Sequence, residues 1–81
     1  MDVISEKVIR CLLENDGYVT TASLADMTGI SVSSIKHNLN WIREELEKFQ
    51  ICLQSTPKKG FCLIATEEER FKALQKLEEE A

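Results

Sequence analysis

The chain is 81 residues long, 43% of them hydrophobic, with three cysteines, one histidine and a formal net charge of −4. A chain of this length can form one compact domain but leaves little room for an enzyme cleft, so its size favours a binding module over an enzyme. The acidic balance counts at first against nucleic acid, because phosphate contacts come from lysine and arginine.

The apolar residues are dispersed along the chain. No apolar run approaches the roughly 18 residues needed to cross a membrane, and the segment MDVISEKVIR has neither the apolar core nor the cleavage site of a secretory signal peptide. We therefore expect a cytoplasmic protein. The odd number of cysteines, their apolar neighbours and the lack of a CxxC pair predict reduced thiols in the core, at Cys11, Cys52 and Cys62.

The charges are unevenly distributed. Acids dominate residues 1–30, residues 67–81 and the EELE run at residues 44–47, whereas residues 31–43 and 48–66 contain no acid at all. The bases of these two acid-free windows are Lys36, Arg43, Lys48, Lys58 and Lys59. The windows coincide with the segments that the motifs below single out.

The first helix is predicted over residues 3–15. One apolar face is formed by residues at helical spacing, namely Ile4, Val8, Cys11 and Leu12. The NDG sequence at Asn15–Gly17 ends this helix, because Asn and Gly tolerate the left-handed conformation found at helix ends. Tyr18 and Val19 then predict a very short strand.

A second, short helix follows in the sequence TASLADMT, residues 21–28, with Thr20 or Thr21 as its N-cap. Its inward residues are predicted to be Leu24, Ala25 and Met27. Gly29 and Ile30 form a turn, and Ser31 has the side chain expected at the N-cap of a third helix.

The third helix carries the most regular apolar pattern of the chain. Its stripe has alternating spacings of four and three residues and consists of Ile35, Leu39, Ile42, Leu46 and Phe49. The pattern predicts one continuous helix from Ser31 to Phe49 or Gln50. Trp41 lies one position before this stripe and is predicted to be partly buried against the last helix.

A β-hairpin is predicted from two short β-prone runs, ICLQS at residues 51–55 and FCLIA at residues 61–65, on either side of the turn TPKKG. Pairing about this turn places Cys52 opposite Ile64 and Cys62 opposite Gln54. A direct disulfide between the two cysteines is therefore not expected in a reducing cytosol.

The last helix begins with a capping box formed by Thr66 and Glu69. Its narrow apolar stripe, Phe71, Leu74 and Leu77, either docks on this domain or joins a dimer or a following domain. The order of elements predicts a mainly α fold with a small β-hairpin: three helices, a two-stranded wing and a C-terminal helix. Residues 1–65 then form a winged helix-turn-helix domain, and residues 66–81 a helix that is a linker to further domains or a dimer element.

The helix-turn-helix itself is supported by two residue types at a spacing of four. The first helix of such a motif needs a small residue where it packs against the second, and the turn needs a residue free to adopt positive φ. Ala25 and Gly29 meet these two needs, and Ile30 and Ile35 supply apolar contacts after the turn.

The chain resembles the N-terminal winged-helix domains of phosphotransferase-regulated bacterial transcription regulators, the PRD-containing activators and antiterminators of the BglG/MtlR type, and related domains of the biotin-operon-repressor type. The resemblance rests on LADMTGIS at residues 24–31, SSIKHNLNWIREEL at residues 33–46 and KKGFCL at residues 58–63, and covers residues 3–65. Val32, Ser33 and Ser34 stand where such relatives often carry arginines. The resemblance implies regulation of carbohydrate genes and, through domains outside this chain, phosphotransferase-system partners.

The residues predicted to contact double-stranded DNA lie on the outer face of the third helix and at the hairpin turn. With the stripe turned inward, Ser33, Lys36, His37 and Asn40 share the opposite face. In the major groove Lys donates to guanine and Asn pairs with adenine, while Ser bonds either a base or a phosphate. Flanking backbone contacts are assigned to Ser34 and Arg43, and wing contacts to Lys58 and Lys59. So few phosphate contacts predict weak, salt-sensitive binding by a monomer and a homodimer in the full-length protein.

Two plainer interpretations stay open. The polar face of the third helix can be an ordinary solvated face, and the domain can be a winged-helix protein-interaction or dimerisation module with little DNA affinity. An enzyme, a cofactor and a metal site are not expected. There is no Gly-rich phosphate loop and no isolated acid pair, and the cysteines lack the paired spacing of zinc ligands.

Overall fold

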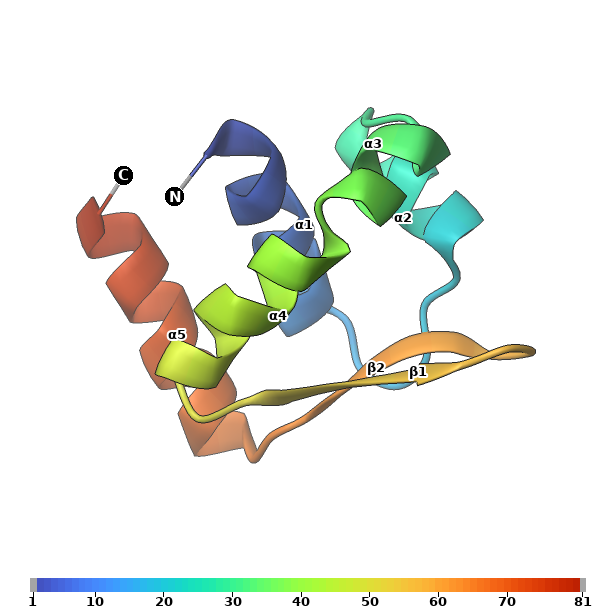
Figure 1. The fold of residues 1–81 in the computed structure, drawn as a ribbon. Helices are drawn as coiled ribbons and strands as arrows, with labels where there is room; N and C mark the ends of the chain where they lie inside the picture. The colour runs from blue at the N-terminus through green and yellow to red at the C-terminus, as the bar shows by residue number, and fades with distance from the viewer. Residues whose placement is uncertain (1, 81) are drawn as a thin grey trace.

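The computed structural model describes residues 2–80, so that Met1 and Ala81, the outer ends of the predicted segments 1–65 and 66–81, lie outside the described residues. Along the chain the elements are α1 (Val3–Glu14), α2 (Thr21–Thr28), α3 (Val32–His37), α4 (Leu39–Lys48), β1 (Cys52–Thr56), β2 (Gly60–Ile64) and α5 (Glu67–Glu80). Figure 1 shows α1 behind α4, with α5 on one side, α2 and α3 on the other and the hairpin below. The predicted fold class, a winged helix-turn-helix with a C-terminal helix, is confirmed.

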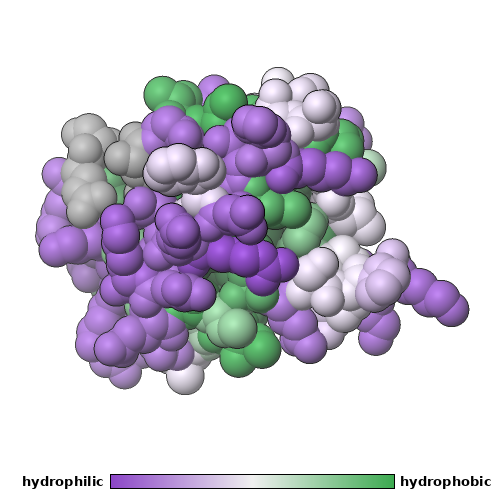
Figure 2. All heavy atoms as spheres, viewed as in Figure 1, coloured by the Kyte–Doolittle hydropathy of each residue, from purple (hydrophilic) through white to green (hydrophobic). Residues whose placement is uncertain are grey.

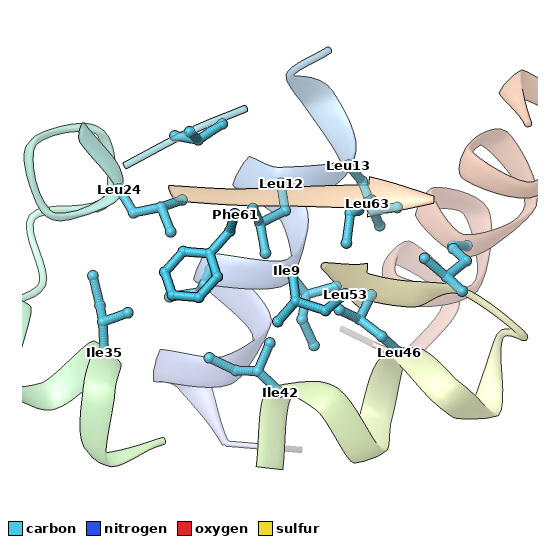
Figure 3. Packing of buried hydrophobic residues seen from close by; sticks show 14 of the residues in the cluster. Ile9, Leu12, Leu13, Leu24, Ile35, Ile42, Leu46, Leu53, Phe61 and Leu63 are labelled. Atoms are coloured by element: carbon cyan, nitrogen blue, oxygen red, sulfur yellow. The ribbon is translucent and has the colours of Figure 1, made fainter. Parts of the chain in front are cut away.

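A single hydrophobic core joins all of these elements (Figure 3). Its buried side chains are Val8, Ile9, Leu12, Leu13, Val19, Leu24, Ile35, Ile42, Leu46, Ile51, Leu53, Phe61, Leu63, Ala73 and Leu77. Since every helix and both strands contribute to it, the hairpin and α5 are held against the three-helix unit by the same burial of apolar surface. No helix among residues 2–80 is long and apolar enough to cross a membrane.

The first two helices begin where the sequence predicts. The carboxylate of Asp2 caps α1 by accepting the backbone N–H of Ser5 at 2.7 Å, and this bond lowers the pKa of Asp2. Thr20 caps α2 by accepting the backbone N–H of Ser23 at 3.1 Å. Of the two threonines proposed for that cap, Thr20 is thus the one used, and each cap satisfies a donor that the first helical turn leaves free.

The predicted continuous third helix is wrong, because the helix is interrupted at Asn38 (Figure 1). Asn38 has φ −98° and ψ 4°, outside the helical range, and its side-chain Nδ2 donates to the carbonyl oxygen of Ser34 at 2.7 Å. Asn side chains compete for backbone carbonyls in this way, and sequence periodicity does not detect it. Ile35, Ile42 and Leu46 on either side of the break are fully buried, whereas Leu39 directly after it is only partly buried.

The end of α4 is a Schellman motif with glutamine in the position that glycine usually takes. Gln50 has a left-handed φ of 62°, its N–H bonds the carbonyl of Glu47, and the N–H of Ile51 bonds the carbonyl of Leu46. The helix therefore ends at Lys48, one or two residues earlier than predicted. The buried pair Leu46 and Ile51 supplies the hydrophobic contact that accompanies this motif.

The hairpin has the predicted register, with Cys52 opposite Ile64 and Gln54 opposite Cys62. Its strands begin and end one residue closer to the turn than expected, because Thr56 still pairs with Gly60. The predicted short strand before α2 is present as a single bridge, in which Val19 and Phe61 exchange two backbone hydrogen bonds of 2.7 Å each. We refer to residues 52–64 as the wing.

Helix α5 begins with the predicted capping box, in which the Thr66 N–H bonds Glu69 and the Glu69 N–H bonds the Thr66 hydroxyl. Its inward face differs from the prediction. Leu77 is buried and Leu74 packs against the core, but Phe71 is 62% exposed, and the buried residue of that turn is Ala73. A small alanine at the contact lets α5 lie close to the core, which a count of large apolar residues does not reveal.

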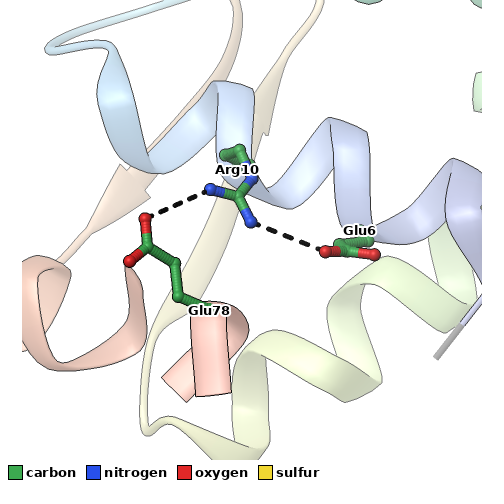
Figure 4. A network of polar contacts seen from close by, with 3 residues as sticks. All are labelled: Glu6, Arg10 and Glu78. Atoms are coloured by element: carbon green, nitrogen blue, oxygen red, sulfur yellow. Dashed lines mark ion pairs between the residues drawn. The ribbon is translucent and has the colours of Figure 1, made fainter. Parts of the chain in front are cut away.

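Two polar contacts tie α5 to the rest of the fold. Arg70 donates to the carbonyl oxygens of Leu12, Leu13 and Asn15 at the end of α1, at 3.4, 3.3 and 3.1 Å. Figure 4 shows the second contact, in which Arg10 on α1 pairs with Glu6 at 3.5 Å and with Glu78 on α5 at 3.6 Å. These contacts favour docking of α5 on this domain, one of the two alternatives left open by its sequence.

Trp41 and the cysteines also depart from expectation. Trp41 is 63% exposed, so its predicted burial against the last helix is wrong; its position on α4 points away from the buried face that contains Ile42 and Leu46. All three cysteines are free, but Cys52 is exposed and Cys11 and Cys62 are only partly buried. The prediction of core thiols is therefore wrong for Cys52, which lies on the outer face of β1.

Candidate nucleic-acid interface

The helix-turn-helix corner is built as the sequence suggests. Gly29 adopts a left-handed φ of 75° and its N–H bonds the carbonyl of Ala25 at 2.9 Å, which ends α2. The hydroxyl of Ser31 accepts the N–H of Ser34 at 3.2 Å and thereby starts α3. Ala25 and Ile30 are partly buried against the core. The angle between α2 and α3 is thus fixed by a glycine, a cap and two apolar contacts.

Four polar side chains are exposed on the second helix of this corner and on the first turn of the helix that follows it. Ser33, Lys36, His37 and Asn40 are all exposed, with the first three on α3 and Asn40 in the first turn of α4. We name these four residues the recognition face. The break at Asn38 lies within it, so the face is formed by two helical segments rather than by one straight helix.

The two flanking residues are less free than the sequence suggests. The Ser34 hydroxyl accepts a hydrogen bond from the Ser31 hydroxyl at 3.0 Å, and Arg43 donates through Nη1 to the carbonyl oxygen of Leu53 at 2.9 Å. Both side chains are partly buried. Ser34 therefore supports the cap of α3, and Arg43 joins α4 to β1 and fixes the wing relative to the recognition face.

Both predicted wing lysines are exposed and lie in the turn between the strands. The N–H of Lys59 bonds the Thr56 hydroxyl at 3.1 Å, which orders the turn. The ammonium of Lys59 lies 5.3 Å from the centre of the Tyr18 ring, within the range of a cation–π contact. Tyr18 belongs to the α1–α2 connection, and no local sequence signal places it at the wing, because the contact depends on the bridge between Val19 and Phe61.

Within residues 2–80, the lysines of the recognition face and of the wing turn form no ion pairs with acids. Among residues 2–80 the ion pairs join Arg10, Lys48 and Lys72 to glutamates, and none of them includes Lys36, Lys58 or Lys59. Figure 2 shows hydrophilic side chains over α4 and α5 and others projecting from the tip of the wing. Three glutamates of α4 and α5 pair with cations outside the recognition face, so part of the acidity behind the net charge of −4 lies elsewhere on the molecule.

Within residues 2–80 no group of three or more His, Cys, Asp or Glu side chains is arranged to hold a metal ion. The site consists of exposed hydrogen-bonding side chains on α3 and at the start of α4, and of two exposed lysines in the hairpin turn. These residue types suit groove and phosphate contacts.

Comparison with known proteins gave one informative result. Searches of curated proteins and of solved structures returned no significant match. The model of the Mga helix-turn-helix domain family matches residues 3–71, which includes α1 to β2 and the first turn of α5. The chain therefore belongs to the Mga helix-turn-helix domain family, a DNA-binding regulatory family and not a family of enzymes.

Proposed function

We propose that the chain binds specific sequences of double-stranded DNA as the DNA-binding domain of a bacterial transcription regulator, with α3 in the major groove. The observation that carries this proposal is the recognition face, in which three exposed hydrogen-bonding side chains lie on the second helix of a helix-turn-helix and a fourth, Asn40, lies in the first turn of α4. This face falls within the acid-free window 31–43, and the wing lysines fall within the second such window, 48–66. Resemblance to phosphotransferase-regulated PRD proteins extends the proposal to carbohydrate genes and to phosphotransferase-system partners bound by other domains.

Each residue of the proposed interface has a distinct role. Lys36 donates to guanine O6 or N7, and Asn40 pairs bidentately with adenine. Ser33 and His37 bond a base edge or a nearby phosphate. Ser34 and Arg43 flank the groove, where the free donors of Arg43 remain available to a phosphate. Lys58 and Lys59 contact the backbone from the wing.

We further propose that the regulator acts as a homodimer. The proposed interface contains few cations, and a protein with few phosphate contacts binds weakly and loses affinity steeply as salt rises. Two copies on half-sites about one helical turn apart double the number of contacts. The exposed side of α5, which includes Phe71, is the surface that we assign to this dimer or to a linker.

The test is fluorescence anisotropy with labelled random-sequence and promoter duplexes at about 50 mM salt, where phosphate contacts are strongest. The triple variant Lys36→Ala/Asn40→Ala/Lys58→Ala is compared with Lys76→Ala, which removes one exposed charge on α5. We expect the triple variant to lose most binding and Lys76→Ala to bind as the wild type does.

A winged-helix protein-interaction module is the second candidate, and a specific observation favours it. Trp41 and Phe71 are 63% and 62% exposed, and large aromatic side chains are enriched in protein interfaces. Sedimentation of the same samples separates the two functions. A wild-type chain that dimerises tightly, and binds DNA no better than the triple variant, would support the second candidate and overturn the first.

A further inference from the structure

We propose that Tyr18, which lies outside both the helix-turn-helix and the wing, is a positioning residue of the DNA-binding surface that holds the ammonium of Lys59 in place before DNA arrives. The contact itself is the distance of 5.3 Å between the Lys59 ammonium and the centre of the Tyr18 ring. The inference rests on the proposed function, since it assigns Tyr18 a part in the binding of the sugar-phosphate backbone.

The backbone fixes Tyr18 relative to the wing. The next residue, Val19, exchanges two hydrogen bonds of 2.7 Å with Phe61 of β2. Gly60 packs so closely against this segment that a Cβ on it would lie 2.3 Å from the carbonyl oxygen of Val19. The connection between α1 and α2 is therefore held against the turn end of β2, and the ring of Tyr18 keeps its place beside the turn.

The ring and the turn together border an open hollow of about 350 Å³, lined by Tyr18, Thr56, Pro57, Lys58 and Lys59. Its lining combines an aromatic ring and a proline with two lysine side chains. This combination suits a backbone phosphodiester with its deoxyribose, because the phosphate meets the cations while the sugar rests on apolar surface. An ammonium has three donors, so Lys59 can face the ring and still donate to a phosphate.

The two wing lysines then differ in kind. Lys58 has no aromatic partner among the described residues and must lose its rotamer freedom when it binds a phosphate. Lys59 has already lost part of that freedom in the free protein, so it loses less conformational entropy when it contacts a phosphate. Removing the ring should weaken DNA binding by about two- to tenfold, the cost of ordering one long side chain.

The experiment measures the affinity of the 81-residue chain for a labelled random-sequence duplex between about 50 and about 200 mM salt. Five forms are compared, namely the wild type, Tyr18→Leu, Tyr18→Phe, Lys59→Met and the double variant Tyr18→Leu/Lys59→Met. Tyr18→Phe is the matched control because it retains the ring. NMR of the free wild type and of the two single Tyr18 variants records the ε-methylene protons of Lys59, which the ring current of Tyr18 shifts upfield.

We expect Tyr18→Leu to abolish the upfield shift and weaken binding, while Tyr18→Phe preserves both. The slope of log affinity against log salt should stay constant in Tyr18→Leu, because the lysine remains, and fall by about one in Lys59→Met, because a phosphate contact is lost. Tyr18→Leu should have no effect on affinity in a Lys59→Met background. A folded Tyr18→Leu that binds as well as or better than the wild type overturns this inference alone, whereas a wild type that fails to bind DNA overturns the proposed function with it.

Discussion

Replacing Gly60 by alanine tests how the wing is attached to the helical unit. Gly60 has a φ of +95°, and a Cβ there would approach three backbone atoms, the closest being the Val19 carbonyl oxygen at 2.3 Å. Backbone cannot move aside as a flexible side chain does, so the two hydrogen bonds between Val19 and Phe61 must lengthen or break. Gly17 is the matched control, because its φ of +75° strains alanine in a similar way and nothing lies within 4 Å of its Cβ position.

The difference between the two variants isolates the clash. Left-handed φ costs alanine about 1–2 kcal/mol at either position. Loss of the bridge removes two hydrogen bonds worth about 0.5–1.5 kcal/mol each, so Gly60→Ala should destabilise the chain by about 1–3 kcal/mol more than Gly17→Ala does. Urea unfolding followed by far-UV circular dichroism gives both free energies of unfolding, and hydrogen exchange at Val19 and Phe61 shows whether the bridge opens. Equal losses in the two variants would refute the account of the wing.

Three further predictions concern other parts of the fold. Arg70→Ala should destabilise the chain by about 1.5–3 kcal/mol. Arg70→Lys should recover less than half of this loss, since lysine lacks the planar guanidinium that reaches several carbonyls. A lysine variant as stable as the wild type in thermal melts would contradict the role of Arg70 in holding α5 to the end of α1. The backbone bond from Ser5 lowers the pKa of Asp2, so its capping contribution is present above the ordinary Asp pKa of about 3.9 and is lost as pH falls through the lower folded value. Asp2→Ala should therefore lower the free energy of unfolding by about 0.5–2 kcal/mol near neutral pH, toward the lower end because the site is exposed, and by much less in acid. A loss of stability that does not change with pH would contradict the cap. Burial and then the nearby Glu14 charge raise the pKa of Cys11, whereas Cys52 is exposed. Timed maleimide labelling followed by mass spectrometry should therefore modify Cys52 first. Faster labelling of Cys11 would contradict the packing of α1 against α2.

Much of the architecture is predictable because it depends on local patterns. Caps at Thr20 and Ser31 follow from side chains that accept backbone N–H groups, and the hairpin register follows from the turn between two β-prone runs. Gly29 is predictable as well, since glycine is the residue that adopts left-handed φ without strain. In each of these cases a few neighbouring residues determine the geometry.

The structure differs from the sequence prediction where the local conformation depends on tertiary contacts or on a residue in an unusual conformation. Gln50 adopts a left-handed conformation that sequence rules reserve for glycine or asparagine, because Leu46 and Ile51 gain burial by it. Phe71 is exposed because the small Ala73 takes the contact position. Asn38 interrupts the helix although the apolar spacing is regular, because its side chain bonds the Ser34 carbonyl while Ile35 and Ile42 on either side stay buried.

The residues of the candidate site could be predicted from the sequence, but the contacts that position them could not. The exposure of Ser33, Lys36, His37 and Asn40 agrees with the periodicity that predicts them on one face. Their participation in DNA binding remains a proposal. The contact of Arg43 with Leu53 and that of Tyr18 with Lys59 each join two different elements of the fold. Such contacts require the folded chain, because no spacing rule predicts which side chain of one element reaches another.

The most direct test of the proposed interface is an NMR titration of the chain with a promoter duplex, followed through the backbone amides. We predict the largest shifts at the recognition face (Ser33, Lys36, His37 and Asn40) and at the wing turn with Lys58 and Lys59, with smaller changes along α5. Shifts centred on α5, or a spectrum that the duplex leaves unchanged at low salt, would contradict the assignment of this surface to DNA.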